Sequence, residues 1–204
     1  MTAAPRLLLP AALLGLLLAL PRAAESTSVK RLTHEELVRD AERIVHADCT
    51  DSSPEWDPSR TRVFTRVRFR VREGFKGGED SGLELLIPGG SLGGIVHVVH
   101  GMPTFQPGEE VVLYATAAHP KSGVRVPVGL DQGCYRIQRE REGGRARARR
   151  DMRELLLVEP GKRAVQGERE TVTLDELTAK VRGEVTRQRK QREDEERRRK
   201  ERGK

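Results

Sequence analysis

The sequence predicts a mainly β protein: a small, closed or nearly closed antiparallel barrel with one early helix and a helical extension at the C-terminus. Two observations carry this prediction. Short apolar segments that alternate with polar residues recur between residues 43 and 158, and Gly- or Pro-rich turns separate them. Aromatic residues make up only 3% of the chain, so the predicted core consists mainly of Val, Leu and Ile.

Residues 1–24 have the order of a secretory signal peptide: MTAAPR, the apolar run LLLPAALLGLLLAL, and small residues. The apolar run is shorter than the roughly 20 residues that a helix needs to cross a bilayer. We therefore expect cleavage after Ala23, Ala24 or Ser26 and a soluble, exported protein, either periplasmic or secreted, with no transmembrane segment after cleavage. A retained membrane anchor is the alternative.

The net charge of +7 is concentrated at the two ends of the chain. Residues 182–204 carry a net charge of +5 and the predicted signal peptide carries +2, which leaves the body neutral. A protein whose basic charge lies in a tail is not a general polyanion binder, so we expect no nucleic acid partner. The sequence predicts four segments: a signal peptide (1–24), a barrel domain (32–158), a linker with the C-terminal helix (159–185), and a charged tail (186–204).

A helix is predicted to begin after Thr33 in the segment LTHEELVRDAE, because Thr33 and Glu36 have the spacing of a capping box. The helix should give way near Arg43 to the β segment RIVHADCT. A loop is expected over residues 51–60, where two prolines lie among Asp and Ser residues. Trp56 lies in this predicted loop. It is either an exposed binding contact or a lid on the mouth of the barrel.

The segment TRVFTRVRFRVRE, residues 61–73, predicts a long strand with two different faces. The inner face consists of Val63, Thr65, Val67, Phe69 and Val71. The outer face consists of Arg62, Phe64, Arg66, Arg68, Arg70 and Arg72. We expect the outer face to be solvated and neutralised by the carboxylates Glu84, Glu109 and Glu110. A polyanion-binding groove is the alternative.

The rest of the chain predicts more strands and a second helix. Glycines around IVHVVH predict a bulged or sharply bent strand, and Gly143 and Gly144 predict the turn of a hairpin. Thr173 and Glu176 form a second capping box, and the apolar stripe of the helix that follows ends at Val185. The tail beyond Val185 is either a solvated helix or disordered, and it serves either solubility or attachment to an anionic surface.

Cys49 and Cys134 are the two cysteines of the chain, and in an exported protein we expect them to form a disulfide. Closing a loop of this length would stabilise the fold by roughly 4 to 5 kcal/mol. Two buried free thiols are the alternative. Neither cysteine belongs to a C-x-x-C pair, which argues against a metal site.

No residue pattern nominates a catalytic site, a metal site or a cofactor. His97 and His100 lie three residues apart, so on a regular strand they face opposite sides. Glu109 and Glu110 are adjacent and point apart for the same reason. A hydrolase with an unrecognised site that uses His97, His100 or Cys134 remains a third hypothesis.

The order of motifs from Leu32 to Ile137 resembles that of a group of poorly characterised exported bacterial proteins. The matching motifs are LTHEEL, AERIV, FKGG, IPGG, FQPGEEVVLY and DQGCYRI. More distantly, this arrangement is similar to netrin-like modules and tissue inhibitors of metalloproteinases, which are OB-type barrels. The resemblance implies an OB-like barrel with a packed helix. The inhibitors act through an N-terminal cysteine, and this chain has no cysteine before Cys49, so their mechanism is not implied.

Together these observations favour a monomeric, exported, non-enzymatic module that binds another protein of the envelope or the extracellular space. The candidate binding surface consists of Trp56, Arg62, Arg66, Arg68, Arg70 and Arg72. The alternative function is attachment to an anionic lipid or polysaccharide surface through the arginine-rich strand and the basic tail.

Overall fold

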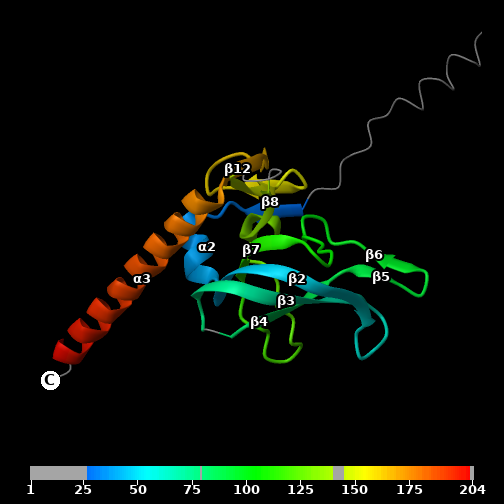
Figure 1. Cartoon of the computed structure of the whole chain (residues 1–204), viewed down its shortest axis with the longest axis horizontal. Coiled ribbons are helices and arrows are strands. Elements are labelled where there is room, and N and C mark those ends of the chain that lie inside the picture. Colours follow the sequence, from blue (N-terminus) through cyan, green and yellow to red (C-terminus); the bar gives the residue numbers. More distant parts are fainter. Residues whose placement is uncertain (1–26, 79, 140–144, 203–204) are drawn as a thin grey trace, which may run out of the picture.

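The computed structural model describes residues 27–78, 80–139 and 145–202 (Figure 1). The predicted signal peptide and the predicted turn at Gly143 and Gly144 lie outside the described residues.

Strands are the main element of the described chain, as predicted. The strands are β1 (Thr27–Lys30), β2 (Arg43–Trp56), β3 (Val63–Lys76), β4 (Gly82–Pro88), β5 (Gly90–Leu92), β6 (Ile95–His97), β7 (Glu110–Ala115), β8 (Cys134–Arg139), β9 (Ala146–Asp151), β10 (Leu155–Val158), β11 (Val165–Gln166) and β12 (Arg169–Thr173). The helices are α2 (His34–Asp40), the short 3-10 helix η1 (Leu130–Gly133) and α3 (Leu174–Arg202).

The main sheet is antiparallel and has the strand order β12-β9-β8-β7-β2-β3-β4. Its two end strands, β12 and β4, are not paired with each other, so the strands do not close into a barrel and the predicted OB-like barrel is not confirmed. A single bridge between Leu86 and Arg125 occupies part of the free edge of β4. Two smaller sheets accompany the main one: β1-β10-β11, in which β1 runs parallel to β10, and the hairpin β5-β6.

The long strands β2 and β3 curve the main sheet. Their pairing shifts register after Ile44, after His46 and after Cys49, and such bulges bend a strand and increase its twist. The predicted loop over residues 51–60 begins too early, because β2 continues to Trp56, which lies opposite Val63. The turn itself spans residues 57–62.

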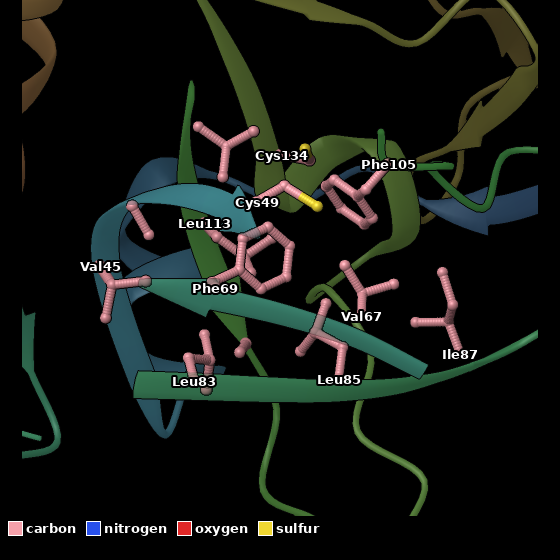
Figure 2. Close-up of a cluster of buried hydrophobic side chains, with 13 residues drawn as sticks. Val45, Cys49, Val67, Phe69, Leu83, Leu85, Ile87, Phe105, Leu113 and Cys134 are labelled. Atoms are coloured by element: carbon pink, nitrogen blue, oxygen red, sulfur yellow. The ribbon is translucent and has the colours of Figure 1, made fainter. Parts of the chain in front are cut away.

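Each face of the curved sheet covers its own hydrophobic cluster, as the period of two requires. On β2, Val45 contributes to one cluster and Ile44 to the other. Figure 2 shows the first cluster, where the rings of Phe69 and Phe105 meet edge to face with centroids 5.1 Å apart. The second cluster lies between the sheet and the helices, and Leu37 of α2 and Leu177 of α3 are buried in it.

Helix α2 has seven residues and begins with the predicted capping box: Glu36 donates its backbone N–H to Thr33 Oγ1, and Thr33 donates its own to Glu36 Oε2. Its C-terminal end is held by a residue that sequence reasoning missed. The Lys76 ammonium donates to the carbonyl oxygens of Val38 at 2.6 Å and Ala41 at 2.5 Å. A cation at this end also complements the helix dipole.

Helix α3 begins with the second predicted capping box, at Thr173 and Glu176. It continues without interruption from the predicted apolar stripe into the charged tail, which is therefore helical as far as Arg202. Gln188 is the last buried residue of α3 and donates to the Glu35 carbonyl at 3.0 Å. Beyond it the helix projects away from the sheet, on the side opposite the β5–β6 hairpin (Figure 1).

Candidate functional site

An open cleft of about 830 Å³ lies beside the β5–β6 hairpin. The hairpin and the segment after it contribute most of its apolar lining. Its charged lining comes from η1, β8, the end of β9 and the turn between β9 and β10. The residues that line it include Val96, His97, Val98, Val99, Met102, Phe105, Asp131, Arg136, Asp151, Arg153 and Glu154.

The hairpin wall exposes an unusual amount of apolar surface. The exposed fractions are 46% for Ile95, 64% for Val96, 66% for Val98 and 38% for Val99. A folded protein seldom leaves neighbouring β-branched side chains in water unless they contact a partner. We refer to these four residues as the apolar arm.

The apolar arm begins on a regular hairpin, and the predicted bulged or bent strand at this place is wrong. Gly93 and Gly94 both have positive φ, as a tight two-residue hairpin turn requires. The hairpin is attached to β3 by His97, whose Nδ1 accepts the backbone N–H of Val63 at 2.9 Å. The sequence signal that could have found the hairpin is the Gly-Gly pair between two short apolar segments.

Asp131 of η1 also lines the cleft. Gly129 and Leu130 both adopt left-handed backbone conformations, with φ of 64° and 62°, and this conformation is rare for a residue with a Cβ such as Leu130. The Asp131 N–H donates to the Gly101 carbonyl at 2.9 Å. These features place Asp131 at the cleft with only 9% of its surface exposed.

The Asp131 carboxylate has no hydrogen-bond or ion-pair partner among the described residues. Burial raises the pKa of Asp131 to about 7; the charge of Arg136 opposes this, and those of Glu154 and Asp151 add to it. A buried carboxyl group with such a pKa in a cleft is typical of functional sites. Sequence reasoning missed Asp131, because nothing in the motif DQGC predicts which of its side chains lacks a partner.

The other acidic groups of the cleft do have donors. Asp151 accepts from Arg153 at 2.7 Å and from Arg169 at 3.0 Å, and these hydrogen bonds hold its pKa well below the usual range. The Glu154 carboxylate accepts the backbone N–H of Gly101 at 3.4 Å. Asp131 therefore differs from its neighbours in having no donor.

The arginine face of β3 is a charge-balanced surface. Arg66 pairs with Glu55 at 2.7 Å and also with Glu84. Arg68 pairs with Glu84 and with Asp51, each at 3.2 Å. The predicted neutralisation by Glu84 is therefore confirmed, while the contributions of Asp51 and Glu55 on β2 were missed.

The second half of this face centres on two carboxylates that are mostly covered. Asp48 pairs with Arg70 at 3.2 Å and with Arg72 at 2.7 Å. Glu110 pairs with Arg139 at 2.6 Å and contacts His46 and Arg72 as well. Of the predicted partners, Glu110 belongs to this face, whereas Glu109 instead lies 3.8 Å from Arg136.

Trp56 and Arg62 lie near the tip of the β2–β3 hairpin, and Trp56 is half-buried rather than exposed. A Cβ built on Gly93 would lie 3.7 Å from the Trp56 ring, which places Trp56 next to the β5–β6 turn. The structure thus separates the candidate residues of the sequence: Trp56 lies near the apolar arm, and the arginines from Arg66 to Arg72 pair with acids along the sheet.

The predicted disulfide between Cys49 and Cys134 is wrong, and both residues are buried free thiols of the first cluster (Figure 2). They belong to β2 and β8, with β7 between them, so about 10 Å separates the two strands across the sheet. A disulfide needs Cα atoms within about 7 Å. Burial raises the pKa of the Cys134 thiol to about 12 and also raises that of Cys49, so neither is poised as a thiolate.

His97 and His119 are each held by hydrogen bonds of their own local structure. Nδ1 of His97 is occupied by the Val63 N–H. In an exposed loop, Ser122 Oγ lies 3.0 Å from Nδ1 of His119, and that same Nδ1 lies 3.3 Å from the Ser122 N–H, which is the pattern of a local turn. Within residues 27–78, 80–139 and 145–202, no three His, Cys, Asp or Glu side chains gather as a metal site would require.

No helix among the described residues is both long enough and apolar enough to span a membrane. Comparisons with protein-family models, with curated proteins and with solved structures found no match for this chain.

Proposed function

We propose that this protein is an exported, non-enzymatic module that recognises another protein of the envelope or the extracellular space, and that it does so with the cleft and the apolar arm. One observation carries the proposal: four exposed β-branched side chains lie on and beside one hairpin, next to a cleft of about 830 Å³. Protein-binding surfaces commonly combine an apolar centre with a polar rim.

The apolar arm is well suited to present a binding surface, because its hairpin is held in place. The tight turn at Gly93 and Gly94 and the hydrogen bond from Val63 to His97 fix the hairpin against β3. A preorganised surface loses less conformational entropy when a partner binds. Export is supported by the signal-peptide pattern of residues 1–24, and the paired arginine face argues against nucleic acid as a partner.

The distant likeness to OB-type modules stays part of this proposal. It is supported by the bulged strands β2 and β3, which curl the sheet over the first hydrophobic cluster. Modules of that kind bind ligands with one sheet face and its adjoining loops.

The test compares two double variants of the mature protein in cross-linked affinity capture from the native envelope and the culture medium, at moderate salt. Val96→Ser with Val98→Ser changes the apolar arm. Val158→Ser with Val165→Ser is the matched control, because these valines are also exposed but lie on β10 and β11. We expect the control to capture the same protein as the native sequence and the arm variant to lose it. Equal capture by both variants would overturn the proposal.

Attachment to an anionic surface is a second candidate, now restricted to helix α3. The observation that favours it is the exposed, apolar-free stretch of α3 beyond Gln188, which projects from the body. A version ending at Val185 should then lose binding to vesicles that contain anionic lipid, and binding of the full protein should fall steeply with salt. Vesicle binding that survives the truncation would exclude this candidate.

A further inference from the structure

We infer that the cleft recognises a Lys or Arg side chain of the partner protein, whose cationic group pairs with the Asp131 carboxylate while neighbouring apolar residues of the partner contact the apolar arm. This inference rests on the proposed function and names the chemistry of the segment that is bound.

Asp131 lacks a donor among the described residues. It is nine-tenths buried, it lines the cleft, and its carboxylate has no partner among the described residues. A buried polar group without a hydrogen bond costs free energy, and a buried charge without a partner costs more. The Asp131 oxygens are not fully enclosed by the protein, so donors of a ligand in the cleft can reach them and reduce that cost.

The unmatched charge of the Asp131 carboxylate is negative. The arginines that line the cleft are already engaged: Arg153 binds Asp151, and Arg136 donates to the Thr104 carbonyl at 2.8 Å. Neither arginine forms an ion pair with the Asp131 carboxylate. The complementary ligand therefore carries positive charge and hydrogen-bond donors.

The lining of the cleft fits the apolar stem of a long cationic side chain. Met102, Val98 and Val99 provide apolar surface beside the charged residues of the cleft. Lys and Arg have long apolar stems that cover such surface while their cationic heads reach a buried acid. A small inorganic cation would gain nothing from this surface, and no metal-ligand cluster of three side chains occurs in the described residues.

The titration of Asp131 provides the readout. Burial raises its pKa to about 7, with Arg136 of β8 opposing the rise and Asp151 of β9 and Glu154 of the next turn adding to it. A cationic ligand binds the ionised carboxylate in preference to the protonated form. It must therefore lower the pKa of Asp131 on binding.

The experiment is a carbon NMR titration of the mature protein with labelled aspartate carboxyl groups, where Asp131→Asn assigns the Asp131 resonance. The probe is Nα-acetyl-arginine methylamide, and the matched control is its citrulline counterpart, which has nearly the same shape and no charge. We expect the arginine probe at millimolar concentration to lower the measured pKa of Asp131 by about one unit, a tenfold preference for the ionised form. The citrulline probe should leave it unchanged.

Two protein variants complete the test. Asp131→Asn should abolish saturable binding of the arginine probe, and Asp175→Asn, which removes an exposed carboxylate on α3, should retain it. An Asp131 pKa that neither probe moves, or that both move equally, would overturn the inference. If the arm variant still loses partner capture in that case, the proposed function stands and only the cationic ligand is rejected. If the arginine probe binds but the arm variant captures normally, the proposed function fails instead.

Discussion

Asp48 on the arginine face and Asp131 at the cleft are two aspartates of almost equal exposure, 8% and 9%, in opposite surroundings. Asp48 accepts hydrogen bonds from Arg72 and Arg70, which hold its pKa below the usual range despite burial. Asp131 has no such donor, and burial raises its pKa to about 7. The arginines of this face thus have acceptors within the molecule, whereas Asp131 has no donor among the described residues and is the group for which we propose a ligand.

The largest expected effect is on the cleft. Asp131→Asn should raise the free energy of unfolding by up to about 4 kcal/mol near pH 8.5, because the native state no longer holds a buried, unpartnered charge. The folded-state pKa of Asp131 is raised, so its contribution to stability declines as pH rises from about 4 to about 7. Urea unfolding near pH 8.5 and near pH 5 should therefore give a smaller gain at the lower pH. A variant less stable than the native protein at both pH values would show that Asp131 has a donor.

The matched change on the arginine face should have the opposite sign. Asp48→Asn should lower the free energy of unfolding by about 1 to 3 kcal/mol at neutral pH, because Arg70 and Arg72 lose their shared acceptor. The pKa of Asp48 is lowered by folding, so its stabilisation is present above about pH 4 and is lost as pH falls further. Urea unfolding of the native protein and the variant over this pH range measures the difference in the free energy of unfolding. If Asp48→Asn were as stable as the native protein, the two aspartates would not differ in the way described.

A smaller effect is expected at an exposed position of the same face. Arg68→Gln should cost about 0.5 kcal/mol at low salt, since its pairs with Asp51 and Glu84 are solvated. The loss should shrink further in high salt, where such pairs are screened. Unfolding experiments at two salt concentrations test this, and a cost comparable to that of Asp48→Asn would mean that the whole face acts as one coupled network.

The smallest effect on stability is expected for the apolar arm. Val96→Ser with Val98→Ser should change the free energy of unfolding by no more than about 0.5 kcal/mol, because both side chains are exposed. The same variant should lose partner capture. A thermal unfolding curve compared with that of Val158→Ser with Val165→Ser provides the control, and a large loss of stability would indicate that the arm packs against the body of the protein.

Local features of the chain were predicted well because they depend on nearby residues. The two capping boxes at Thr33 and Thr173 are present, and the alternation on residues 61–73 buries Val67 and Phe69 as expected. Capping and strand periodicity arise from the geometry of a few consecutive residues. The end of β2 was predicted too early because only the local turn residues were considered. Pairing with β3, which depends on the tertiary structure, extends the strand past them.

The candidate site was not predicted, for a physical reason. The apolar arm is identified as a site by the exposure of its side chains. Asp131 is identified by the lack of a donor among the described residues. Whether a side chain has a partner depends on segments far apart in the chain, such as Gly101, which binds the backbone of Asp131. No local pattern contains that information.

The sequence by itself determined the mainly β class, the beginnings of both helices and the two-sided character of β3, because each follows from short-range geometry and the period of the side chains. The tertiary structure alone decided that the sheet stays open, that Cys49 and Cys134 remain free, that Lys76 closes the end of α2 and that Asp131 is left unpaired among the described residues. These outcomes depend on the register and order of strands, which place distant groups together or keep them apart.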